Sequence, residues 1–151
     1  MKNLSLIVIV ILSIVFFYSE NYAQHNQLQR KLNSENKIRT ESFILDEIEK
    51  AISKGDVNKV SEYFSSQPYL SFLGGVNGYY SSNQAYYILE DFFYEYKVIS
   101  FTFENKRVEE SVCYGTGLYS YEREGKRETA HLYVTLNKVG NKWYITQISA
   151  N

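Results

Sequence analysis

Polar and apolar side chains alternate without exception along residues 129–136. Ala130, Leu132, Val134 and Leu136 would lie on one side of an extended chain, and the polar residues between them would lie on the other. A period of two is typical of a β-strand that buries one face and leaves the other in water. The chain is therefore expected to contain a sheet with a second layer packed on only one of its sides.

Further strands are expected on both sides of this segment. Turn-forming sequences such as Glu124-Gly125-Lys126 and Gly140-Asn141 separate them. The strand-forming segments are Val98–Glu109, Val112–Glu122, Arg127–Val139 and Lys142–Ser149. Because short turns join antiparallel neighbours, the last third of the chain is predicted to form a curved antiparallel sheet.

Helical periodicity comes before the strands. A first helix follows a cap at Thr40 or Ser42 and is expected to bury Phe43, Ile44, Leu45, Ile48, Ala51 and Ile52. The sequence Lys54-Gly55-Asp56 ends it, because glycine accepts a positive φ, and Asp56 caps a second helix. The predicted buried stripe of the second helix consists of Val57, Val60, Tyr63 and Phe64.

A third helix is expected after a turning segment. Pro68 stops the second helix, Tyr69–Leu73 has the composition of a short strand, and the following glycines, Gly74, Gly75 and Gly78, favour tight turns. Ser81 and Gln84 have the spacing of a capping box, behind which the helix runs to about Tyr96 and buries Ala85, Ile88, Leu89, Phe92 and Phe93. Helices followed by a run of strands predict an α+β fold, with N-terminal helices packed on a curved antiparallel sheet.

The amino terminus has the pattern of a signal peptide. Lys2 precedes the apolar run Leu4–Tyr18, which is shorter than the ~20 residues that a membrane-spanning helix needs. Cleavage is predicted after Ala23, although Asn21 occupies the position three residues before the cleaved bond, where a small residue is usual. The alternative is that the segment stays uncleaved and anchors the protein. Residues 1–23 are thus assigned to a signal peptide, 24–40 to a flexible polar leader and 41–151 to one folded domain, so the protein is expected to be periplasmic or secreted.

The composition argues against several functions. The formal net charge of −1 provides no field for nucleic acid or, after signal cleavage, for a membrane surface. The single cysteine, Cys113, excludes an intramolecular disulfide and reads as a buried structural thiol. Apart from carboxylates, the remaining metal-binding side chains are His25 and His131, so no metal site is expected. No phosphate-binding or dinucleotide-binding motif points to a cofactor.

The order of these pieces resembles a bacterial secreted family known as domain of unknown function 4783. The matching pieces are Ala51-Ile52, Lys54-Gly55-Asp56, Tyr63-Phe64, Tyr80-Ser81, Gln84-Ala85, Asp91-Phe92-Phe93, Gly115-Thr116-Gly117 and Trp143-Tyr144-Ile145-Thr146. The resemblance covers about Phe43 to Ser149 and implies a cone-shaped fold of the nuclear transport factor 2-like kind. It carries over no catalytic residue, and fold alone does not decide activity.

A non-catalytic binding or scaffolding module is the preferred function. It would hold a small apolar or partly polar ligand in the cone, or a partner through the sheet. The residues expected to line the pocket or core are Phe64, Phe103, Leu118, Leu132 and Trp143. A homodimer through the sheet is a further hypothesis, with the polar row His131, Tyr133 and Thr135 at or near the contact.

The alternative is a small-molecule isomerase, dehydratase or hydrolase. Glu90 or Asp91 would point into the cone, where an apolar wall would raise the pKa of a general base or acid. Tyr87 or Tyr119 would then donate a hydrogen bond to the developing oxyanion. A buried carboxylate within reach of a tyrosine hydroxyl would favour this enzyme, whereas an interior filled by aromatic rings would favour binding or scaffolding.

The segment Gly115-Thr116-Gly117 has the glycine spacing of a phosphate loop. It falls inside a strand pattern, however, where glycines more often mark a bulge or a sharp bend. We therefore interpret it as a bend in the sheet.

Overall fold

The computed structural model describes residues 29, 31, 32 and 43–151. The predicted signal peptide and most of the predicted leader lie outside the described residues, and positions 29, 31 and 32 are helical. The domain consists of a helix over residues 43–53, hereafter the first helix, then α2 (Val57–Ser61), β1 (Phe64–Ser71), β2 (Asn77–Tyr79), α3 (Ser82–Glu95), β3 (Lys97–Val108), β4 (Val112–Arg123), β5 (Lys126–Val139) and β6 (Lys142–Ala150). Within this part of the chain, no helix is long and apolar enough to cross a membrane.

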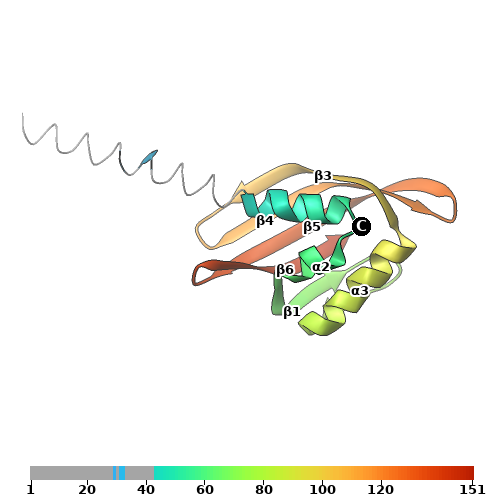
Figure 1. Ribbon diagram of the computed structural model, residues 1–151, viewed down its shortest axis with the longest axis horizontal. Coiled ribbons are helices and arrows are strands. Elements are labelled where there is room, and N and C mark those ends of the chain that lie inside the picture. Colours follow the sequence, from blue (N-terminus) through green and yellow to red (C-terminus); the bar gives the residue numbers. More distant parts are fainter. Residues whose placement is uncertain (1–28, 30, 33–42) are drawn as a thin grey trace, which may run out of the picture. The chain divides into compact units, whose positions relative to one another are not determined.

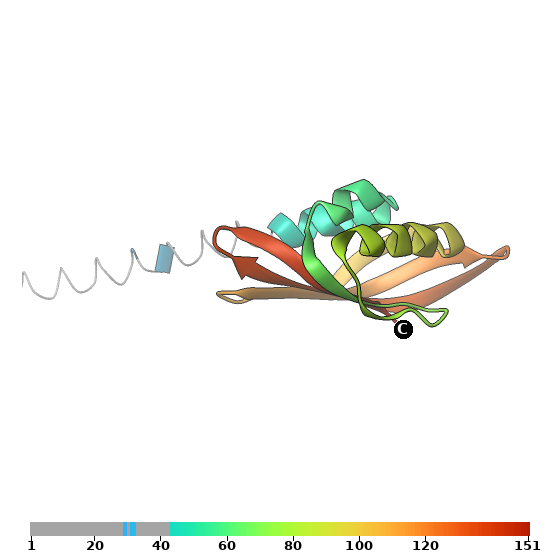
Figure 2. The ribbon, with the colours of Figure 1, turned by 90° about the horizontal axis from the view of Figure 1, so that it is seen from below.

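The strands form one curved sheet, with the helices on one side of it. The strand order is β2-β1-β6-β5-β4-β3, and all neighbours are antiparallel except β1 and β6, which run parallel. Figure 2 shows the first helix, α2 and α3 on the same side of the sheet. The predicted α+β fold with helices packed on one face is confirmed.

The start of β1 differs from the prediction. Phe64 was expected to end a helix, yet it begins the strand and pairs with Ile145 of β6. Pro68 lies inside this strand, where the register shifts between Phe64 and Tyr69. Because proline has no N–H to donate, it is tolerated at such an irregularity. Pairing with β6 therefore extends the strand through a residue that local propensity treats as a stop.

The starts of α2 and α3 agree with the expected caps, whereas Thr40 and Ser42, expected to cap the first helix, lie outside the described residues. Asp56 accepts a hydrogen bond from the backbone N–H of Lys59 at 3.1 Å and so caps α2. Ser81 and Gln84 form the predicted capping box at the start of α3. Gly55 has a φ of +64°, a conformation that favours glycine, between the first helix and α2.

The two glycines of β4 allow β3 to approach closely. A Cβ atom on Gly117 would lie 2.1 Å from the carbonyl oxygen of Thr102, and one on Gly115 would lie 2.6 Å from the ring of Phe103. Opposite them, the register of β3 shifts between Phe103 and Asn105. The predicted irregularity is present, but the extra residue belongs to β3 rather than to the glycine-containing strand.

The shift in β3 turns Lys106 toward the helices. Its ammonium group lies 2.6 Å from Asp46 and 2.8 Å from Glu49, both on the first helix. Glu49 also accepts a hydrogen bond from the backbone N–H of Phe103 at 3.2 Å. Burial lowers the pKa of Lys106, but the hydrogen bonds to the two carboxylates outweigh that effect and raise it above 10.5. These contacts hold the first helix against β3, which is an edge strand of the sheet.

Candidate functional site

Aromatic rings fill the space between α3 and the sheet. Tyr119 is fully buried, and its ring centroid lies 5.5 Å from that of Phe92 and 6.4 Å from that of Phe93. Its hydroxyl donates to the backbone carbonyl of Tyr96 at 2.6 Å. Burial, together with nearby Tyr121, raises the pKa of Tyr119. The hydroxyl is thus protonated and already engaged.

The predicted catalytic residues do not come together around this interior. Glu90 and Asp91 are exposed on α3, and Tyr87 is 57% exposed on the same helix. Asp91 borders a cleft of about 120 Å³ between α3 and the turn after β1, which neither Tyr87 nor Tyr119 lines. None of the described carboxylates is buried.

The predicted pocket residues divide between two faces of the sheet. Phe64, Phe103 and Leu132 are buried beneath the helices, and Trp143 is half-buried against that core. Leu118 lies on the opposite face and is 37% exposed, because successive side chains of a strand point to opposite faces and its neighbour Tyr119 points inward. These five residues therefore do not share one pocket.

The outward side of β4 and β5 forms an exposed surface, which we call the open face. It consists of the cross-strand pairs Tyr114 and Thr135, Thr116 and Tyr133, Leu118 and His131, and Ser120 and Thr129. Tyr114, Leu118 and Tyr133 are each between 37% and 39% exposed. The first helix, α2 and α3 all lie on the other side of the sheet (Figure 2). Apart from His131, the open face carries no ionisable group other than tyrosine.

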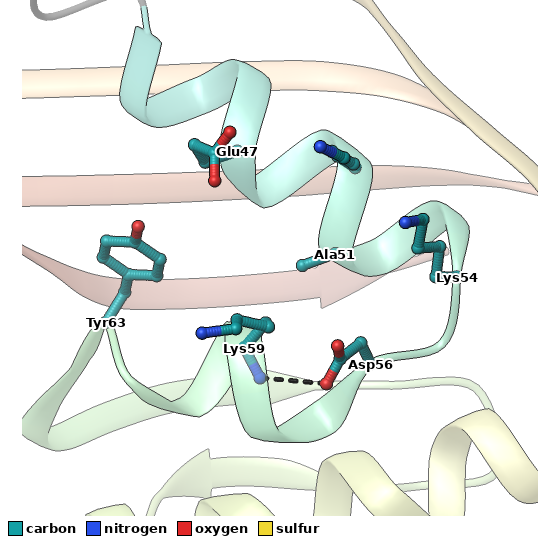
Figure 3. A pocket seen from close by; sticks show the side chains of 7 residues that line it. Glu47, Ala51, Lys54, Asp56, Lys59 and Tyr63 are labelled. Atoms are coloured by element: carbon teal, nitrogen blue, oxygen red, sulfur yellow. Dashed lines mark hydrogen bonds between the residues drawn. The ribbon is translucent and has the colours of Figure 1, made fainter.

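A second candidate site is a cleft between the first helix and α2, hereafter the lysine cleft. It has a volume of about 230 Å³ and is lined by Glu47, Lys50, Ala51, Lys54, Asp56, Lys59 and Tyr63. Figure 3 shows Glu47 on the first helix and Lys54 in the turn after it, across the cleft from Lys59 and Tyr63. Burial raises the pKa of the Tyr63 hydroxyl, and the neighbouring Glu47 carboxylate raises it further.

The lysine cleft was not predicted from the sequence. Tyr63 was expected in a buried helical stripe, but α2 ends at Ser61 and Tyr63 is half-buried beside the cleft. The available signal was the presence of three lysines, Lys50, Lys54 and Lys59, spaced four and five residues apart around Gly55. That Lys59 faces them depends on the turn at Gly55, which sequence spacing does not describe.

Metal-ligand geometry is not found among residues 43–151 or the three described positions before them. No group of three or more His, Cys, Asp or Glu side chains there could hold a metal ion. Cys113 is buried on the inward side of β4.

The chain has the fold of nuclear transport factor 2-like proteins. An NTF-2 like protein of unknown function from Shewanella oneidensis is 15% identical over 74% of this chain and 98% of that one, with a TM-score of 0.54. A Xanthomonas campestris protein named for a calcium/calmodulin dependent protein kinase II association domain is 17% identical, covering 75% and 86%, with a TM-score of 0.57.

The chain belongs to the family described as domain of unknown function (DUF4783), whose sequence profile matches residues 45–151. A crystal structure of a member from Bacteroides uniformis is similar, with a TM-score of 0.64 and 18% identity over 70% of this chain and 94% of that one. No curated protein matches the chain. The resemblance expected from the sequence is confirmed.

Proposed function

We propose that this protein is an exported, non-catalytic scaffolding module that self-associates through its open face. The observation that carries the proposal is the run of uncharged, half-exposed cross-strand pairs centred on Leu118, His131 and Tyr133. Interfaces are enriched in tyrosine and depleted of charge at their centre, and the open face has both properties.

A second copy is the occupant that this chemistry favours. In a two-fold dimer each open face would lie on the same face of the partner, so a charged patch would repel itself, whereas this one would not. The name of the Xanthomonas campestris neighbour refers to association, which is consistent with a self-associating use of this fold.

The filled interior supports scaffolding over catalysis. The enzyme alternative needs a buried carboxylate near a free tyrosine hydroxyl. Tyr119 instead donates to the Tyr96 carbonyl, and the described carboxylates are all at least partly exposed. The ring of Phe92 packs on those of Phe72, Tyr96 and Tyr119, and such packing favours scaffolding over a ligand held inside the fold.

Sedimentation velocity over a range of protein concentrations tests the association. The wild-type protein is expected to form a dimer, and Tyr133→Arg is expected to weaken it at least about tenfold, because a charge would be buried without a partner. The matched control is Tyr94→Arg, since Tyr94 is 88% exposed on α3 and lies off the open face. A wild-type protein that stays monomeric at high concentration would sink the proposal, as would equal loss of dimer in both variants.

Export is tested separately. Cell fractionation followed by intact-mass measurement is expected to find the protein outside the cytoplasm with Gln24 at its amino terminus. A full-length cytoplasmic protein would contradict export without bearing on the dimer.

A further inference from the structure

The lysine cleft has no part in the proposed dimer contact, because it lies among the helices and the open face lies on the other side of the sheet. Its walls come from two helices and from Tyr63, which follows α2. Glycine at position 55, with its φ of +64°, makes the turn that sets Lys54 and Lys59 on facing walls. Local backbone geometry therefore brings these cations to one concave site.

Two of the three lysines in the cleft have no carboxylate partner among the described residues. Lys50 lies on the first helix and Lys54 in the turn that follows it, and both line the cleft. Neither forms an ion pair with any residue that the structure describes. By contrast, Lys106 on β3 contacts two carboxylates.

The acids of the cleft only partly offset these cations. Asp56 is engaged at the N-terminus of α2, where it accepts the Lys59 backbone N–H. The Lys59 ammonium contacts Glu62 at 2.9 Å, but both side chains are more than half exposed, so the pair is weak and readily exchanged. Glu47 is the remaining carboxylate, and it lies near Tyr63 rather than between Lys50 and Lys54.

We propose that the lysine cleft binds the phosphate group of a small phosphorylated molecule or free phosphate, with Lys50, Lys54 and Lys59 as the cationic ligands. Lysine binds phosphate as a compact point charge with rotatable donors. Ammonium groups on two facing walls suit a tetrahedral oxyanion, which presents oxygens in several directions, better than a planar carboxylate. The Tyr63 hydroxyl adds a neutral donor, since burial and Glu47 keep it protonated.

The size of the cleft limits the ligand. Its volume of about 230 Å³ is below the ~300–1,000 Å³ typical of sites for drug-sized molecules. A phosphate with a short attached chain fits this volume. The ligand is therefore expected to be phosphate itself or a small phosphate monoester.

Titration of the purified protein with inorganic phosphate at low ionic strength, followed by amide NMR shifts, tests the proposal. Saturable shifts are expected along residues 47–63. Lys50→Gln and Lys54→Gln are each expected to weaken phosphate binding about fivefold. Glu47→Gln is expected to tighten it, because this change removes a negative charge from the wall. The matched control is Lys126→Gln, which changes an exposed lysine in the β4–β5 turn and should leave the affinity unchanged.

Two further arms identify the ligand chemistry. Glycerol phosphate binding more tightly than inorganic phosphate supports a phosphate monoester, and the reverse order supports the free ion. Succinate binding more tightly than both would overturn the proposal, as would the absence of saturation or an equal loss of affinity in Lys126→Gln. Tyr133→Arg should keep wild-type phosphate affinity, so the test of phosphate binding does not depend on whether the dimer forms.

Discussion

Buried Tyr119 and exposed Leu118 are consecutive residues of β4, yet they belong to regions with opposite properties. Inward from this strand, rings pack against α3 at centroid distances such as 5.5 Å between Tyr119 and Phe92, and the Tyr119 hydroxyl has a backbone partner. Outward, Leu118 and its neighbours on the open face lie on the side of the sheet away from the first helix, α2 and α3. Tyrosine and apolar side chains thus stabilise the fold on the inward face, whereas on the outward face they remain available for contact with another molecule.

Removing a ring from the interior is expected to have the largest effect. Phe92 contacts the rings of Phe72, Tyr96 and Tyr119, so Phe92→Ala leaves a cavity and should lower the free energy of unfolding by about 4 kcal/mol. Urea denaturation measures this change. On the same helix, Tyr94→Ala should stay within about 0.5 kcal/mol of wild type, since Tyr94 is 88% exposed. Similar losses in both variants would mean that the interior is not the region that stabilises the domain.

Placing a side chain between β3 and β4 should have the next largest effect on stability. Gly117→Ala would place a Cβ atom against the carbonyl oxygen of Thr102 and force the strands apart, at a cost of about 3 kcal/mol of unfolding free energy. In the control, Gly78→Ala, the nearest atom to the new Cβ is the Tyr80 hydroxyl oxygen at 3.5 Å, so the change should cost less than about 1 kcal/mol. Thermal or urea unfolding compares the two variants, and a Gly117→Ala protein as stable as wild type would refute the close approach.

The smallest expected effect concerns one hydroxyl. Tyr119→Phe leaves the buried Tyr96 carbonyl without its donor and should cost about 1.5 kcal/mol at neutral pH, whereas Tyr133→Phe on the open face should change the stability of the monomer little.

The same variant predicts a change in alkaline stability. Because burial raises the folded-state pKa of Tyr119 above 10.0, its ionisation favours the unfolded chain, so stability is complete below about pH 10 and falls as the pH rises toward the folded value. Above pH 10, Tyr119→Phe should therefore lose stability less steeply than wild type. Unfolding measured at a series of pH values checks this slope, and parallel slopes would show that Tyr119 ionises equally in both states.

Much of the fold was predictable from local patterns. The strict alternation at Thr129–Leu136 and the capping box at Ser81 and Gln84 give the right elements at nearly the right residues, because both depend on neighbours close in sequence. The start of β1 at Phe64 was not predictable, since it depends on pairing with Ile145 far along the chain.

The candidate sites were less predictable than the fold. The polar row His131, Tyr133 and Thr135 was correctly placed on the side away from the helices by its period of two. The lysine cleft was missed, because its facing walls are set by how the chain turns at Gly55 and not by any spacing of its charges.

By itself, the sequence determined the α+β class and the side of β5 that faces the helices, since periodicity and turn chemistry act over a few residues, and the order of its short motifs indicated the family. Only the tertiary structure decided that the interior is filled by rings, that Leu118 and Phe103 lie on opposite faces, and that three lysines share one cleft. Those outcomes depend on contacts between residues distant in the chain, whose geometry packing alone fixes.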